Sequence, residues 1–194
     1  MRRRVAIGLA PGKTADSFGL AVVEVVKTLP LPFGTGRPEY HVIHLHTFPP
    51  GTDYEPIFAQ LHKILAEHDV IYIAMDQTAV GAPIVRMVSE ELGKYVDPVI
   101  IGGQHRQHQN YVPKNNLVSV TRVALMKERL RISQGLKETP NLTKALLNYE
   151  NRPTSTASSN DDPWREHPSD HLIFAVALPC WKFEQQIDFS CDWI

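Results

Sequence analysis

Three extended runs of apolar residues open the chain. Residues 4–9 and 18–26 are mostly apolar or β-branched, and residues 40–48 alternate apolar with polar side chains. Alternation with a period of two is typical of a β-strand with one buried face. The segment 29–38 between the second and third runs contains so many Pro and Gly residues that it is expected to be a loop. The pattern predicts three antiparallel strands in succession.

The middle of the chain changes to an alternation of helical and buried extended segments. Apolar residues recur with a helical period over residues 52–68 and again over residues 81–92. Each of these segments is adjacent to a continuous apolar run, at residues 70–75 and 96–101. Because both faces of a parallel strand are usually covered, uninterrupted runs of this kind are typical of parallel strands. Two parallel strands are therefore predicted after the first three.

The last third of the chain is predicted to be helical, apart from one polar segment. Helical periods cover residues 115–132 and 141–149. Residues 151–163 are rich in Ser, Thr and Asn without an apolar period, so a mobile loop is expected there. A final helix is predicted over residues 170–178, and Pro179 should end or kink it because proline has no backbone N–H.

The order of these elements, β-β-β-α-β-α-β-α-α-α, predicts an α/β fold. Its mixed sheet has three antiparallel strands followed by two parallel strands, and helices flank it. The length of 194 residues suits one sizeable domain spanning residues 1–194. Apolar residues make up 43% and charged residues 21%, as in ordinary globular proteins. These values exclude a collagen, a coiled coil and a wholly disordered chain.

The composition also predicts the compartment. No apolar run approaches the roughly 20 residues that span a bilayer, so no membrane partner is expected. The two cysteines, Cys180 and Cys191, lack the spacing of a zinc site and are too few for a disulfide framework. We therefore expect a cytoplasmic protein with reduced thiols. The formal net charge of −1 implies no overall attraction to polyanions, so the distribution of charge matters more than its sum.

Two aspartates occupy positions where functional groups gather in α/β sheets. Asp76 directly follows the predicted strand 70–75, and Asp170 stands at the start of the last helix. Carboxylates from separate segments, at the carboxyl ends of strands, suit the binding of hard divalent cations. The structural alternatives are an Asx turn or helix cap for Asp76 and an ordinary N-cap for Asp170. After the first strand Ala10 stands where a two-metal site needs a carboxylate, and it cannot bind a cation. Asp16, six residues later, could serve only if the loop folds back.

A basic segment accompanies these acids. Between residues 104 and 137, seven Lys and Arg residues stand against the single acid Glu128. Such a cluster can neutralise the phosphates of a polyanion, and the structural alternative is a solvated helix face. The candidate DNA-binding residues are Arg106, Lys114, Arg122, Lys127, Arg129 and Arg131.

Four segments, taken in order, resemble the nuclease domain of the large terminase subunits of tailed phages, which has an RNase H-like fold. Residues 72–81 (YIAMDQTAVG) resemble the strand of that family with its Asp and D-x-T-x-x-G turn. Residues 112–118 (VPKNNLV) resemble its V-P-K-x-x-L-V helix entry, and residues 128–132 (ERLRI) its G-R-L-R-I segment. Residues 164–173 (WREHPSDHLI) resemble its ending W-R-E followed by H-D-D-L-V. The similarity extends over nearly all of residues 4–181.

The resemblance implies a divalent-metal-dependent endodeoxyribonuclease. In that family three acidic residues bind two Mg²⁺ or Mn²⁺ ions, and the enzyme uses these ions to cut concatemeric DNA during genome packaging. By position, Asp76 matches the second acid and Asp170 lies in the third motif, so these two are the expected catalytic residues. The family's H-D-D is here Ser169-Asp170-His171, which makes His171 a third expected metal ligand. Because Ala10 replaces the first acid, cleavage is expected to be weak or absent.

The resemblance also implies partners. Double-stranded DNA is the expected ligand, together with a separate packaging ATPase, a small terminase subunit or a portal, because the ATPase motifs of the family are missing here. The expected location is the cytoplasm of a bacterial host, with the gene carried by a phage or prophage. Two alternatives stay open: a catalytically dead DNA-binding or assembly module, and an actin-like ATPase half. The last needs glycine-rich phosphate turns in two hairpins, and only Gly12 is available.

Overall fold

The computed structural model describes residues 2–11, 17–26, 37–78, 81–102, 110–150 and 170–190. Within these residues seven strands form one sheet in the order β6-β5-β4-β1-β2-β3-β7. The strands are β1 (Arg4–Ala10), β2 (Phe18–Val26), β3 (Glu39–Phe48), β4 (Asp69–Asp76), β5 (Val96–Gly102), β6 (Tyr111–Pro113) and β7 (Leu130–Ile132).

The pairing of the five central strands is the predicted one. Strands β1, β2 and β3 pair antiparallel, β4 pairs parallel with β1, and β5 pairs parallel with β4. The prediction of an α/β fold with an RNase H-like mixed sheet is therefore confirmed. The sheet is wider than predicted, because β6 pairs parallel with β5 at one edge and β7 pairs parallel with β3 at the other.

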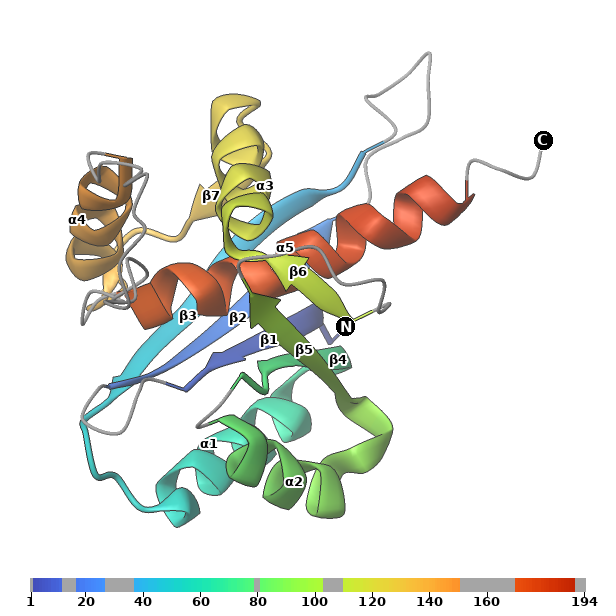
Figure 1. The fold of residues 1–194 in the computed structure, drawn as a ribbon, viewed down its shortest axis with the longest axis vertical. Helices are drawn as coiled ribbons and strands as arrows, with labels where there is room; N and C mark the ends of the chain where they lie inside the picture. The colour runs from blue at the N-terminus through green and yellow to red at the C-terminus, as the bar shows by residue number, and fades with distance from the viewer. Residues whose placement is uncertain are drawn as a thin grey trace, which may run out of the picture.

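Helices cover both faces of the sheet (Figure 1). Helices α1 and α2 lie on one face, where they pack on the side chains of Val5, Ile7 and Leu9 from β1. Helix α5 crosses the other face, with α3 and α4 packed beside it, and Ala6 and Ala10 of β1 belong to that apolar cluster. The helices are α1 (Tyr54–Glu67), α2 (Gly81–Leu92), η1 (Gly93–Tyr95, a 3₁₀ turn), α3 (Lys114–Met126), α4 (Thr139–Glu150) and α5 (Asp170–Ser190).

The helix predicted over residues 115–132 ends earlier than expected. Helix α3 stops at Met126, and residues Leu130–Ile132 form β7. The break lies at Glu128, whose φ of 55° is in the left-handed region that favours glycine. The resembling terminase segment G-R-L-R-I has glycine at this position. The helical spacing of apolar residues, on which the prediction was based, gives no sign of this turn in the backbone.

Pro179 does not end α5, which was one of the two outcomes, an end or a kink, that the sequence predicted. The helix continues to Ser190, and the proline lies in its interior. Proline has no N–H to donate to the carbonyl of Ala175, four residues earlier. That carbonyl instead faces Gly8 of β1 so closely that a Cβ on Gly8 would lie 1.8 Å from the Ala175 oxygen. The carbonyl of Pro179 accepts a hydrogen bond of 2.7 Å from the Tyr72 hydroxyl, which fastens the helix to β4.

Some predictions fall on residues that the structure does not describe. They include most of the expected loop at residues 29–38, the expected loop at residues 151–163, the DNA-binding candidate Arg106, Ser169 of the third motif, and Cys191. Of the helices that are described, none is both long enough and apolar enough to cross a membrane.

Candidate functional site

Ala10 and Asp76 lie side by side at the carboxyl ends of β1 and β4. Leu9 pairs with Met75 in the parallel β1–β4 ladder, so the next residue of each strand, Ala10 and Asp76, are neighbours. Side chains alternate between the two faces of a sheet. Ala10 belongs to the apolar cluster under α5, as does Ala74, two residues before Asp76 in β4. Ala10 and Asp76 therefore face the same side, toward α5.

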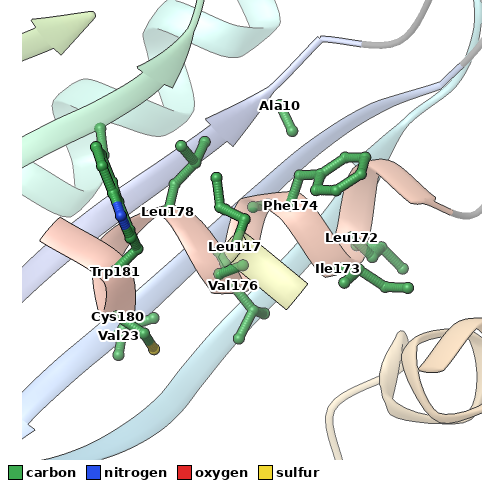
Figure 2. Close-up of a cluster of buried hydrophobic side chains, with 14 of the residues drawn as sticks. Ala10, Val23, Leu117, Leu172, Ile173, Phe174, Val176, Leu178, Cys180 and Trp181 are labelled. Atoms are coloured by element: carbon green, nitrogen blue, oxygen red, sulfur yellow. The ribbon is translucent and has the colours of Figure 1, made fainter. Parts of the chain in front are cut away.

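Asp170 reaches the same edge of the sheet from α5. It is the first residue of the helix and is completely buried. The backbone carbonyl of the next residue, His171, would lie 2.7 Å from a Cβ on Gly19, and Gly19 pairs with Ala10. The start of α5 thus packs on the beginning of β2, next to the end of β1. Figure 2 shows Ala10 at the end of its strand together with Leu172, Ile173 and Phe174 of the first turns of α5.

The carboxylate of Asp76 is held by the turn that follows it. Its Oδ1 accepts a hydrogen bond of 2.8 Å from the backbone N–H of Thr78. The Thr78 hydroxyl donates to the carbonyl of Ile101 and accepts from the N–H of the same residue, at 3.1 and 2.8 Å. The Asx turn that the sequence left open is therefore present. It ties Asp76 to the end of β5 and orients the carboxylate.

The expected third metal ligand does not join the two aspartates. His171 Nε2 lies 3.4 Å from Thr47 Oγ1, on the β3 side of the helix. Among the described residues no three His, Cys, Asp or Glu side chains are grouped so as to hold a metal ion. The ligand set Asp76, Asp170 and His171 is thus not assembled. With the buried methyl group of Ala10 in place of a carboxylate, this edge does not fit the two-ion site that the terminase resemblance implies.

Arg129, expected to bind DNA, is buried and has a structural role instead. Its guanidinium donates to the carboxylate of Glu184 in α5 and to the carbonyl of Pro38, the second at 3.2 Å. Glu184 also accepts a hydrogen bond of 3.0 Å from the Tyr40 hydroxyl. These contacts join β7, β3 and the second half of α5. The prediction that Arg129 contacts DNA is therefore wrong, because its charge is already matched inside the protein.

Two further groups near Glu184 are neutral at physiological pH. Burial raises the pKa of Tyr40 well above its ordinary value, with a smaller contribution from the negative charge of Glu184. Burial also raises the pKa of the Cys180 thiol, the free cysteine of α5. The charged groups of this cluster are Arg129, Glu184 and the more exposed Arg37, which lies 3.7 Å from the Glu184 carboxylate. Cys180 behaves as a small apolar residue of the core.

The other basic candidates differ in how far their side chains are exposed to solvent. Arg122, Lys127 and Arg131 are exposed, and Arg131 lies 3.3 Å from the carboxylate of Glu39. Lys114 is 8% exposed, and its Nζ lies 5.0 Å from the centroid of the Phe174 ring. A buried ammonium group of this kind is not available to a DNA phosphate on the surface. The prediction of Lys114 as a surface DNA contact is therefore corrected.

Two glycines that position the site were not identified from the sequence. Gly8 and Gly19 allow the backbone of α5 to approach β1 and β2, and this approach brings the start of the helix close to Gly19, the ladder partner of Ala10. The available signal was a glycine inside each predicted strand, which often marks a close approach of another backbone.

No protein-family model and no curated protein matches the sequence. The chain is similar to a solved structure of RuvC from Thermus thermophilus, with 21% sequence identity and a TM-score of 0.46. The similarity covers 94% of this chain and 96% of the RuvC chain. The fold class, an α/β mixed sheet with helices on both faces, rests on the strand order and pairing of the sheet itself.

Proposed function

We propose that residues 1–194 form one nuclease-type domain of the terminase kind, which binds double-stranded DNA during phage genome packaging and cleaves it weakly or not at all. The proposal is supported by the position of Asp76 beside Ala10 at the ends of β4 and β1, and by the start of α5 at Asp170, where the next residue packs on Gly19, the ladder partner of Ala10. The ordered terminase-like segments support it. A packaging ATPase, a small terminase subunit or a portal would supply the functions of the family that these residues lack.

Weak cleavage follows from the residue at the end of β1. Two Mg²⁺ or Mn²⁺ ions activate water and stabilise the leaving oxygen in phosphodiester hydrolysis, and they need carboxylates around both positions. Here Ala10 supplies a methyl group that is 1% exposed. The residues present therefore favour a site with little or no hydrolytic activity.

The exposed basic residues beyond β3 offer a surface for DNA phosphates. Arg122 and Lys127 lie on α3 and just after it, and Arg131 lies on β7. Arg122 and Lys127 belong to the side of the molecule that carries α5. Arg131 alternates with Leu130 and Ile132 of the apolar cluster under α5, so its side chain points to the other face of the sheet. DNA held by Arg122 and Lys127 would lie on the face of the sheet toward which Asp76 points.

Removing two of these charges tests the DNA surface. The double variant Arg122→Ala/Lys127→Ala should bind duplex DNA more weakly and lower the slope of log affinity against log salt by about 2, because each lost phosphate contact removes about 0.9. Fluorescence anisotropy across a salt series measures both quantities. The matched control is Lys63→Ala/Arg86→Ala, which removes two exposed charges from α1 and α2 on the opposite face. Equal slopes for the parent and the first variant would show that DNA does not use this surface.

A catalytically dead DNA-binding or assembly module is the second candidate, and the buried methyl group of Ala10 favours it. A weakened nuclease and a dead module differ in whether the parent protein itself nicks plasmid DNA slowly. Slow nicking that Asp76→Asn abolishes supports a weakened nuclease. Nicking that is unchanged by Asp76→Asn comes from a contaminant and supports the module.

A further inference from the structure

The carboxyl edge of the sheet holds buried charges that need compensation. Among the described residues the buried charged side chains are those of Asp76, Asp170, Lys114 and Arg129, and His171 is buried beside them. Glu184 matches Arg129 near the start of β3, as described above. Burial of an ion is costly unless an opposite charge compensates it. We therefore consider the buried charges of Asp76, Asp170 and Lys114 together.

Lys114 stands close to this edge by its place in the fold. It is the first residue of α3, directly after β6, and the preceding Pro113 pairs with Gly102 at the end of β5. Its ammonium nitrogen lies 5.0 Å from the centroid of the Phe174 ring, and Phe174 is one helical turn after Asp170 in α5. The lysine therefore points toward the first turns of α5, where Asp170 begins the helix.

The same edge connects Lys114 to Asp76 through β5. Thr78, whose N–H is bonded to the Asp76 carboxylate, exchanges two hydrogen bonds with Ile101. Ile101 in turn pairs with Val112 of β6, two residues before Lys114. The carboxyl ends of β4, β5 and β6 thus bring Asp76 and Lys114 to one end of the sheet, beneath the start of α5.

We infer that the ammonium group of Lys114 compensates the buried carboxylates of Asp76 and Asp170 in the protein without bound metal. The formal charges of two carboxylates and one ammonium group sum to −1. With a third carboxylate at position 10 and the same ammonium group, the sum would be −2, which equals the charge that one divalent cation neutralises. The inference uses the convergence of Asp76 and Asp170 on which the proposed function also rests, but it requires no cleavage.

A double-mutant cycle in EDTA tests this compensation without reference to activity. Urea unfolding is measured for the parent, Lys114→Met, the pair Asp76→Asn/Asp170→Asn, and the triple combination. Removing one partner of a buried charge cluster should reduce the folding equilibrium constant about 100-fold or more in Lys114→Met. In the background without the two carboxylates, the same change should reduce it less than about tenfold. Equal reductions in the two backgrounds overturn the inference.

A control lysine and a metal titration complete the test. Lys182→Met removes a lysine whose Nζ lies 2.7 Å from Asp97, and its effect should be the same in both backgrounds. If Lys114→Met does not fold alone, folding of the triple variant supports the inference, and failure of the triple variant refutes it. Lys114→Met should also bind Mn²⁺ at least about tenfold more tightly than the parent. Equal Mn²⁺ affinities contradict the inference, whereas failure of DNA binding would affect only the proposed function.

Discussion

Replacing Ala10 with aspartate should raise the Mn²⁺-dependent rate of plasmid nicking about 1,000-fold above that of the parent protein. Ala10 is the neighbour of Asp76 across the β1–β4 ladder and faces the start of α5. A carboxylate there would complete the acidic set that the fold brings to this edge. One carboxylate of a two-ion site contributes several kcal/mol of transition-state stabilisation, which corresponds to this change in rate.

The measurement is a time course of supercoiled plasmid conversion with Mn²⁺, in which the nicked and linear products are quantified. Ala10→Asn is the matched control, because it has nearly the same size without the charge and should stay inactive. Asp170→Asn added to Ala10→Asp should return the rate to that of the parent. Robust cutting by the parent itself would refute the claim that Ala10 disables the site.

Replacing Gly8 with alanine should destabilise the protein by about 3 kcal/mol or more. A Cβ at this position would lie 1.8 Å from the backbone oxygen of Ala175 and 2.7 Å from Cδ of Pro179. Neither obstacle is the flexible end of a side chain, so α5 would have to move away from β1. The carbonyl of Ala175 approaches the strand here because Pro179 cannot donate a hydrogen bond to it.

Urea unfolding followed by circular dichroism measures the effect. Gly93→Ala is the matched control, since a Cβ on Gly93 meets no atom within 4 Å, and its stability should change by less than about 0.5 kcal/mol. A Gly8→Ala protein as stable as the control would mean that α5 does not pack on β1 as described.

The elements predicted from the sequence were those whose side chains carry a clear period. The five central strands and the helices at residues 54–67 and 81–92 follow directly from alternation, continuous apolar runs and the helical stripe. Strands β6 and β7 were missed because three residues are too few to show a period, and their pairing depends on neighbours distant in the sequence. The continuation of α5 past Pro179 was missed for a related reason: the glycine that accommodates it lies in β1.

For the site, residue type and order indicated the candidate positions but not how buried their side chains are. Asp76 and Asp170 were identified because each stands at the end or the start of a recognisable element. Lys114 and Arg129 were assigned to DNA because a basic residue on a helical period is usually exposed. The partners that bury them, Phe174 and Glu184, lie on α5 and cannot be paired with them from spacing alone.

The central claim is that Asp76 and Asp170 face each other across the position of Ala10. Crystals of Ala10→Asp soaked in Mn²⁺ test it most directly, through the anomalous scattering of the bound ion. The account predicts an anomalous peak within about 2.5 Å of carboxylate oxygens of both Asp76 and Asp170 in the variant, and none at this edge in the parent. A peak bound by only one of the two, or carboxylates that point to separate surroundings in the variant, would contradict it.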